Sequence, residues 1–313
     1  MSRILFMGTP DFAVPSLKRL YEDGHEIVGV LCQPDKPKGR GMKLVFPPVK
    51  QAALDLGLAV DQPTVLKDNA LQSLLEEKRP DLIAVVAYGR LLPPYVLQYP
   101  RLGCVNLHGS LLPKYRGAAP IQRSVLAGDR TVGVTTMFMA EKLDAGDMIL
   151  QYETELLPGE TSGELHDRLM VAGADLLSKT VALLETGEAP RIPQREADAT
   201  YAPMLLKEEG LVDWREGPEA LCRKILGLNP WPTAYTSLKG QPLKLYRAFP
   251  AEEKTEKEPG TALSVVRGKG LLVACGGGRG LYVSELQAAG GKRMGAEEYF
   301  RGHPELLGAV LGQ

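Results

Sequence analysis

Residues 81–109 read DLIAVVAYGRLLPPYVLQYPRLGCVNLHG, and this stretch decides the fold. Its first part, DLIAVVAYG, is an almost unbroken apolar run that is rich in β-branched residues. Its last part, GCVNLHG, is a second apolar run. Near-continuous apolar strands are typical of parallel sheets whose two faces are both covered by helices.

The same alternation extends through the first half of the chain. Further strands are expected at 3–8, 26–33, 131–139 and 147–154, and helices at 12–22, 49–56, 71–77 and 162–186. Strands that alternate with helices indicate an α/β domain. We therefore predict an open, mostly parallel, Rossmann-like sheet over residues 1–187.

The pattern of apolar and polar residues changes after residue 187. Residues 188–206 contain prolines and charges without sustained periodicity, and we interpret them as a linker that wraps the first domain. Short β-like runs follow, separated by the turn sequences KGQP, RGKG and GGGRG. Such spacing predicts a small C-terminal β-barrel domain over residues 207–313.

Composition bounds the possible functions. The chain has 313 residues, 44% hydrophobic and 24% charged, with a net charge of −1, so global charge does not indicate a nucleic-acid partner. No apolar run approaches the roughly 18 residues of a membrane span. The start, MSRILFMGTP, is too short for a targeting peptide, and we expect a cytoplasmic protein.

Four cysteines are widely separated and form no CxxC pair: Cys32, Cys104, Cys222 and Cys275. We expect small core side chains rather than a disulfide framework or a zinc site, and no metal is expected. The turn GTPDF after the first strand lacks G-x-G-x-x-G, so a dinucleotide cofactor is not expected.

The segment 106–120, NLHGSLLPKYRGAAP, places polar side chains where a strand should end. Residues two apart in a strand face the same side, so Asn106 and His108 should point together, at the sheet edge where ligands bind. An amide and an imidazole there can hold the oxygen of a carbonyl that becomes tetrahedral. Pro113 resists a helix, so SLLP could line a flat, partly apolar ligand.

The spacing does not match a Ser-His-Asp or Cys-His arrangement, which favours direct transfer between two bound substrates over a covalent acyl-enzyme. A carboxylate would then orient His108 and help to remove a proton from an attacking amine. The best candidate is Asp144, in the loop MAEKLDAGDMI, with Asp147 as its competitor. Taken singly, each of these residues is more typical of a structural role.

Several stretches occur in order from one end of the chain to the other. They are FMGTPDFAVPSL, QPDKPKGRGMKLVFPPVK, VVAYGRLLP, RLGCVNLHGSLLPKYRGAAPIQRS, LDAGD and LGLNPWPTAY. Together they resemble the folate-dependent formyltransferases, and among these the family that acts on methionyl-tRNA. The resemblance covers essentially the whole chain.

The resemblance implies a role for particular residues. The catalytic residues of the family fall on Asn106, His108 and Asp144, and its tetrahydrofolate-contacting loop falls on Ser110, Leu111, Leu112 and Pro113. Its tRNA-inserting loop falls on the glycine-flanked basic segment 34–49, where Lys38, Arg40 and Lys43 are the candidate tRNA contacts and Arg40 the main reader. The small barrel resembles an OB-like tRNA-binding domain.

Within that barrel, ordinary surface charge and phosphate contact remain equally open for Lys244, Arg247, Arg267, Lys269, Lys292 and Arg293. Trp231 could stack or pack, and packing is favoured because tryptophan is usually well buried.

The resemblance implies transfer of the formyl group of 10-formyltetrahydrofolate to the α-amine of initiator methionyl-tRNA, by a protein expected to be monomeric. The alternative is a formyltransferase for another amine, such as an amino sugar or a glycinamide ribonucleotide. An enzyme for the glycinamide would need only the first domain. A non-catalytic RNA-binding protein is disfavoured by the intact triad.

Overall fold

The structure, a computed structural model, describes residues 1–38 and 43–313. The chain forms two compact units. The first contains residues 1–120, 132–154 and 166–202, and the second contains residues 121–131, 155–165 and 203–313. Both units are discontinuous in sequence, and the domain limits at 187 and 207 stay a prediction.

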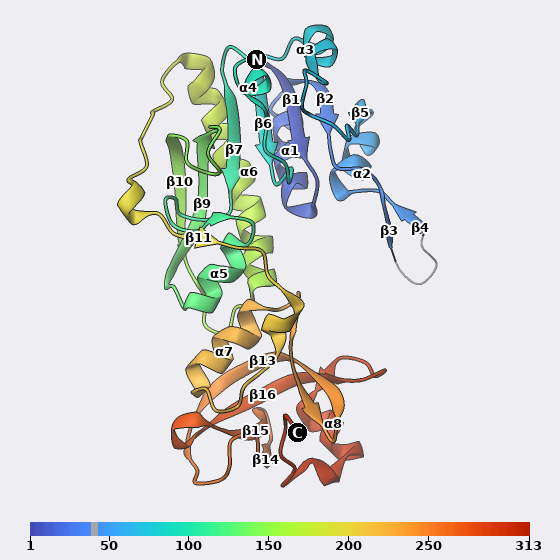
Figure 1. Ribbon diagram of the computed structural model, residues 1–313, viewed down its shortest axis with the longest axis vertical. Coiled ribbons are helices and arrows are strands. Elements are labelled where there is room, and N and C mark those ends of the chain that lie inside the picture. Colours follow the sequence, from blue (N-terminus) through green and yellow to red (C-terminus); the bar gives the residue numbers. More distant parts are fainter. Residues whose placement is uncertain (39–42) are drawn as a thin grey trace. The chain divides into compact units, whose positions relative to one another are not determined.

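Within the described residues, the first unit is built on a seven-stranded sheet in the order β10-β9-β7-β6-β1-β2-β5 (Figure 1). The strands are β1 (Arg3–Gly8), β2 (Glu26–Leu31), β5 (Val60–Asp61), β6 (Leu82–Val86), β7 (Cys104–His108), β9 (Thr131–Phe138) and β10 (Met148–Glu155). The pairs from β5 to β7 are parallel, whereas β9 runs antiparallel to β7. The predicted mostly parallel sheet is confirmed.

Helices lie on both faces of this sheet. They are α1 (Val14–Glu22), α2 (Pro48–Asp55), α3 (Gln72–Lys78), α4 (Pro94–Leu97) and α6 (Ser162–Thr186). On one face, Leu5 of β1 shares a buried cluster with Leu75 of α3 and Val96 of α4. On the other face, Leu107 of β7 lies against α6 at Gly173, where an added Cβ would be 2.8 Å from a Leu107 methyl carbon.

The alternation of side chains along β7 decides where its polar residues point. Cys104 belongs to the cluster that contains Val96, whereas Leu107 faces α6. Since alternate residues of a strand share a face, Asn106 and His108 lie on the side of Cys104. They are therefore close to the carboxyl end of β7 and away from α6.

Short elements complete the described chain. They are β3 (Lys36–Lys38), β4 (Lys43–Val45), β8 (Arg116–Gly117), β11 (Tyr201–Ala202), β17 (Met294–Gly295) and the 3-10 turns Asp11–Ala13, Glu196–Asp198, Lys207–Gly210, Gly276–Gly278 and Pro304–Leu306. β3 pairs with β4, and β8 pairs in parallel with β11.

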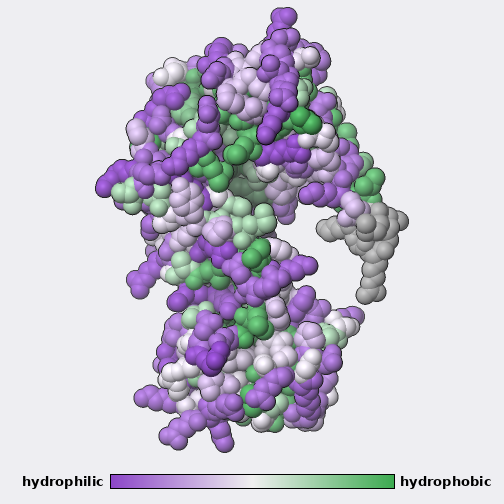
Figure 2. Space-filling model, in the orientation of Figure 1, coloured by the Kyte–Doolittle hydropathy of each residue, from purple (hydrophilic) through white to green (hydrophobic). Residues whose placement is uncertain are grey.

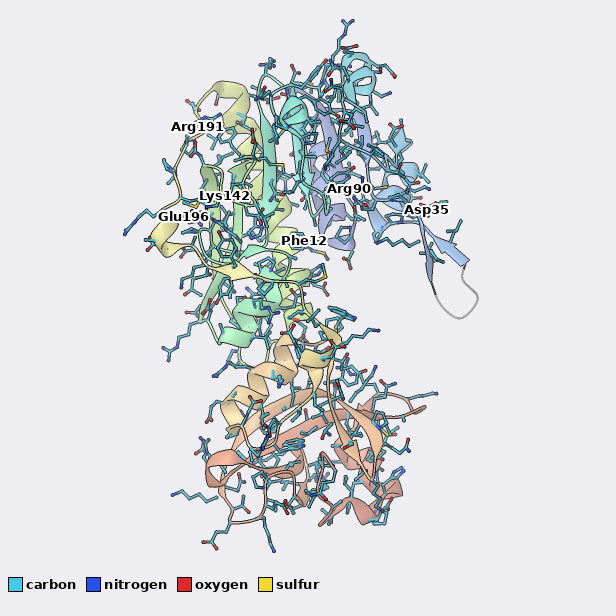
Figure 3. The ribbon with its side chains drawn as sticks, viewed as in Figure 1. Phe12, Asp35, Arg90, Lys142, Arg191 and Glu196 are labelled. Carbon is cyan, nitrogen blue, oxygen red and sulfur yellow. The ribbon has the colours of Figure 1, made fainter. Side chains whose placement is uncertain are left out.

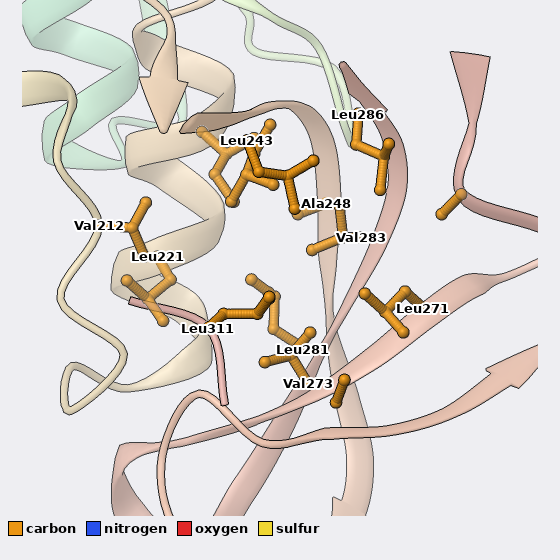
Figure 4. Close-up of a cluster of buried hydrophobic side chains, with 14 of the residues drawn as sticks. Val212, Leu221, Leu243, Ala248, Leu271, Val273, Leu281, Val283, Leu286 and Leu311 are labelled. Carbon is orange, nitrogen blue, oxygen red and sulfur yellow. The ribbon is translucent and has the colours of Figure 1, made fainter. Parts of the chain in front are cut away.

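The second unit contains an antiparallel sheet in the order β12-β13-β16-β15-β14, with β17 beside β16. Its elements are α5 (Pro120–Ala127), α7 (Pro218–Gly227), β12 (Ala234–Leu238), β13 (Gln241–Lys254), β14 (Ala262–Val266), β15 (Gly270–Cys275), β16 (Arg279–Ala288) and α8 (Ala296–Gly302). Figure 4 shows its core, in which Leu221 of α7 packs with strand residues such as Val273 and Leu281.

The last six residues bridge the two edge strands of this sheet. Ala262 N donates to Ala309 O and Leu311 N donates to Gly260 O, beside β14. Gly312 N donates to Ser237 O of β12. The segment 308–313 therefore pairs with both edges, which leaves less free strand edge for aggregation.

The two tryptophans differ in burial, and one of them differs from the expectation. Trp231 is 50% exposed, so the prediction that it packs in the core is wrong. Trp214 is the buried one, and its Nε1 donates to Thr236 Oγ1 at 3.0 Å. Two prolines flank Trp231 in a turn after α7, and this turn displays the ring rather than burying it.

The cysteines behave as small core side chains, as predicted. Cys32, Cys104 and Cys275 are buried free thiols, and Cys222 is half-buried. Burial raises the pKa of Cys104 and of Cys275 to about 12. The face drawn in Figure 2 is mainly hydrophilic, with apolar groups in small patches. No helix in the described part of the chain has the length and apolar character that a membrane crossing requires.

Candidate active site

Strand β7 carries the first two candidate residues. Asn106 and His108 are 9% and 6% exposed, and they pair with Met137 and Thr135 of β9. Among the described residues, no group makes a hydrogen bond to the Asn106 side-chain amide. The amide can therefore donate to a ligand without first breaking a protein contact.

The His108 ring is held from one side. Its Nε2 lies 2.9 Å from the carbonyl oxygen of Tyr115. A carbonyl can only accept, so Nε2 carries the hydrogen in this contact. The other nitrogen, Nδ1, lies 3.7 Å from Asp144 Oδ2, which is an ion-pair distance when the ring is protonated but too long for a direct hydrogen bond.

Asp144 belongs to the loop between β9 and β10. Its carboxylate accepts a hydrogen bond from Gly117 N at 2.8 Å. Gly117 has φ of +120°, and an added Cβ would lie 2.8 Å from Ala202 O, so this close backbone approach requires glycine. Asp147, the competing candidate, instead lies 3.6 Å from Arg191, a residue labelled in Figure 3. The structure thus brings Asp144 to His108.

Thr135 organises the segment Ser110–Pro113. Its hydroxyl donates to Ser110 O at 2.7 Å and accepts from Leu112 N at 3.1 Å. Gln151 Nε2 donates to Leu112 O at 2.9 Å, and Ser110 Oγ donates to Lys114 O at 2.6 Å. Leu112 is 3% exposed, while Leu111 and Pro113 are partly exposed, so the segment presents a mixed apolar and backbone-polar wall.

The basic segment 34–49 has a short antiparallel stem in which Lys38 pairs with Lys43. Arg40, and the side chains of Lys38 and Lys43, lie outside the described residues, so their expected tRNA contacts stay predictions. The stem is anchored at its base by Asp35.

That anchor is a polar cluster. Lys50 Nζ lies 2.7 Å from Asp35 Oδ2 and 2.8 Å from Gln62 Oε1, and Gln62 Nε2 donates to Asp35 Oδ1 at 2.8 Å. Hydrogen bonds from Lys50 and then Gln62 hold the pKa of Asp35 below its usual value. Arg90, labelled with Asp35 in Figure 3, contacts Gln33 Oε1 at 3.3 Å. The cluster ties the stem to residues that follow β2, β5 and β6.

The basic candidates of the second unit divide into two groups. Glutamates pair with Arg247, Lys269 and Arg293. Among the described residues, no acidic group forms an ion pair with Lys244, Arg267 or Lys292, and all three are exposed. The second group is therefore better placed to meet a polyanion.

Sequence reasoning did not single out Thr135, Gln151, Arg116 or Gln194 as parts of the site. Gln194 lies in the predicted linker, yet its Nε2 donates to Asp144 O at 2.9 Å. Nothing in the local pattern marks it, because its partner is 50 residues away. Within the described residues, no group of His, Cys, Asp and Glu side chains is arranged to hold a metal ion.

Residues 2–181 match the formyl transferase family model, and residues 204–304 match the model of the formyl transferase C-terminal domain. The chain is 49% identical over 310 residues to the methionyl-tRNA formyltransferase of Moorella thermoacetica, with 99% of each chain covered. It is 48% identical over 313 residues to that of Bacillus subtilis, with 100% of this chain and 98% of the relative covered.

The chain belongs to the methionyl-tRNA formyltransferase family. This confirms the resemblance seen in the sequence motifs. The folds of solved structures agree at much lower identity. HypX from Aquifex aeolicus in complex with tetrahydrofolic acid is 18% identical with a TM-score of 0.63, covering 96% of this chain and 47% of that chain. An N-formyltransferase from Helicobacter canadensis is 15% identical with a TM-score of 0.66, covering 90% and 99%.

Proposed function

We propose that this chain transfers the formyl group of 10-formyltetrahydrofolate to the α-amine of methionine on initiator tRNA. The proposal rests on the sequence identity of 48% and 49% to two methionyl-tRNA formyltransferases. This similarity extends along the whole chain and includes both domains that match the family models. We place the reaction in the cytoplasm, where translation starts. All proposed groups come from one chain, and we propose a monomer.

The chemistry follows from the site geometry. The amine attacks the formyl carbon, a new C–N bond forms, and charge develops on the formyl oxygen. The free Asn106 amide donates to that oxygen, which is a preorganised oxyanion contact. The bond from the carbon to the folate nitrogen then breaks, and the departing nitrogen takes a proton.

In this proposal His108 and Asp144 carry out the two proton transfers. Tyr115 O occupies Nε2, so Nδ1 is the ring nitrogen left for proton transfer. A protonated Nδ1 faces the Asp144 carboxylate at 3.7 Å and supplies the proton to the leaving nitrogen. Asp144 stabilises the imidazolium and accepts, through water, the proton that the attacking amine loses.

The substrates are assigned to two surfaces. The segment Ser110–Pro113 is proposed to line the folate, because Thr135 and Gln151 hold its backbone groups in place. Lys38, Arg40 and Lys43 are proposed to contact the tRNA. In the second unit, whose OB-like character and tRNA binding are also part of the proposal, Lys244, Arg267 and Lys292 are the favoured phosphate contacts, since phosphates are met mainly by Lys and Arg.

The test incubates the purified protein with 10-formyltetrahydrofolate and methionyl initiator tRNA, and measures formylmethionyl-tRNA and released tetrahydrofolate in equal amounts. An uncharged initiator tRNA is the control acceptor. Formylation of an amino sugar in place of methionyl-tRNA, or the absence of any formylmethionyl product, would overturn the proposal.

A further inference from the structure

Residues 192–202, which we call the strap, cross the first unit beside the Asp144 loop. One end is held by a bridge in which Met148 N donates to Ile192 O at 2.9 Å and Ile192 N donates to Met148 O at 3.0 Å. At the other end β11 pairs with β8. The strap is therefore fixed on both sides of its middle residues.

Gln194 lies in the middle of the strap and uses both ends of its side-chain amide. Its Nε2 donates to the carbonyl oxygens of Asp144 at 2.9 Å and Gly146 at 2.8 Å. Its Oε1 accepts from Arg116 Nε at 3.1 Å. One side chain thus bonds two backbone carbonyls of the loop that carries the carboxylate.

The Asp144 loop has a conformation that needs outside support. Asp144 has φ of +48°, in the left-handed region that few residues other than glycine adopt. Such a backbone persists when surrounding contacts determine it. Gln194 supplies such contacts, because it bonds the carbonyl of Asp144 itself and the carbonyl of Gly146 two residues further on.

Arg116 gives Gln194 a rigid partner. The Arg116 side chain is 1% exposed, and its charge is compensated by Glu196 Oε2 at 2.8 Å. Glu196 also pairs with Lys142, beside it in Figure 3. A buried, paired guanidinium has little freedom to move. Its bond to Gln194 Oε1 therefore fixes the orientation of the Gln194 amide and directs Nε2 toward the two loop carbonyls.

The chain neighbours of Arg116 touch the catalytic pair directly. Tyr115 O accepts from His108 Nε2, and Gly117 N donates to the Asp144 carboxylate. The strap reaches both neighbours, because Tyr115 N donates to Thr200 Oγ1 at 2.8 Å and Gly117 pairs with Ala202 of β11. The ring and the carboxylate are therefore set against one another by a single network.

We propose that Gln194 is a positioning residue that acts through Asp144. By bonding the carbonyls of Asp144 and Gly146 while Arg116 holds its own oxygen, it keeps the carboxylate opposite His108 Nδ1. This inference rests on the proposed function and goes beyond it, since it assigns a role in catalysis to a segment that looks like a linker.

The first test replaces Gln194 by alanine in the full chain and measures formyl transfer to methionyl-tRNA. Misplacement of a reacting group by about 1 Å can cost about 100-fold in rate, so we expect kcat to fall by about 10- to 100-fold. The two KM values should change by less than about threefold, because neither substrate is bound by this side chain. Gln72→Ala, which removes a half-buried glutamine of α3 that bonds Glu76, is the matched control and should retain wild-type kcat.

A second variant separates the donor from the acceptor side of the amide. Gln194→Glu keeps the length and the contact with Arg116 but has no N–H to give to the two carbonyls. It should lose as much kcat as Gln194→Ala while still unfolding in a cooperative thermal transition, which shows that the chain remains folded. Wild-type kcat in Gln194→Glu would overturn the proposal, because the two donated bonds would then be unnecessary.

A double-mutant cycle decides whether Gln194 acts through Asp144. If it does, Gln194→Ala should lower kcat by less than about twofold in an Asp144→Asn background, because residues that act as a unit are not additive. A full multiplicative loss in that background would mean that Gln194 acts elsewhere and would overturn the proposal. Wild-type turnover is the reference, so failure of the proposed function itself would appear separately, as no product from the unmodified chain.

Discussion

Asp144→Asn is the sharpest test of the site. The change keeps the size of the side chain and one oxygen that can accept a hydrogen bond from Gly117 N. In the unmodified chain that nitrogen lies 2.8 Å from the carboxylate. It removes the negative charge that lies 3.7 Å from His108 Nδ1. The substitution therefore isolates the charge from the packing of the loop.

The size of the effect follows from that distance. Two unit charges 3.7 Å apart interact by about 4 kcal/mol at an effective dielectric constant of about 20. Each 1.4 kcal/mol or so of lost transition-state stabilisation is about tenfold in rate. The His108 imidazolium that supplies the proton to the leaving nitrogen loses this stabilisation in Asp144→Asn, so kcat should fall by up to about 1,000-fold. Substrate KM values should stay close to wild type.

The assay follows formylmethionyl-tRNA under saturating 10-formyltetrahydrofolate, with thermal unfolding measured in parallel. Asp147→Asn is the matched control, three residues further along the same loop and facing Arg191. We expect it to retain kcat within about twofold, because its charge is partly exposed and screened. The reasoning is refuted if Asp144→Asn keeps wild-type kcat, or if Asp147→Asn loses as much activity.

Three further predictions test other parts of the structure. Thr135→Val leaves buried groups of the Ser110–Pro113 segment unpaired, so it should cost about 1–3 kcal/mol of unfolding free energy and raise KM for the folate, whereas Thr135→Ser should behave as wild type. Asp35→Asn removes a negative charge next to the basic stem, and this loss of charge alone should strengthen RNA binding. We expect instead a several-fold higher KM for methionyl-tRNA, measured in steady-state formylation, because the anchor to Lys50 weakens; a lower KM would contradict the anchoring role. At pH 8 a thiol with its pKa raised to about 12 is ionised in only about one molecule in 10,000, so iodoacetamide should leave Cys104 and Cys275 unmodified in the native protein and label them after denaturation, as read by mass spectrometry.

The sequence predicted the architecture well where the pattern is local. The apolar runs at 81–89 and 103–109 became β6 and β7, and the long periodic segment 162–186 became α6 with the same bounds. Burial of both sheet faces produces these patterns directly, so they can be recognised without the tertiary structure. The exposed ring of Trp231 was missed because average burial says nothing about a proline-flanked turn.

The sequence by itself determined that Asn106 and His108 share one face at the end of a strand, because the two-residue period of a strand is a local property. Its motifs also determined the family. Only the tertiary structure decided how close the Asp144 carboxylate lies to His108, that Thr135 bonds the backbone of Ser110, and that Gln194 links Arg116 to the Asp144 carbonyl. These contacts join segments up to 78 residues apart, and hydrogen bonds over such separations exist only after the sheet and the strap have packed together.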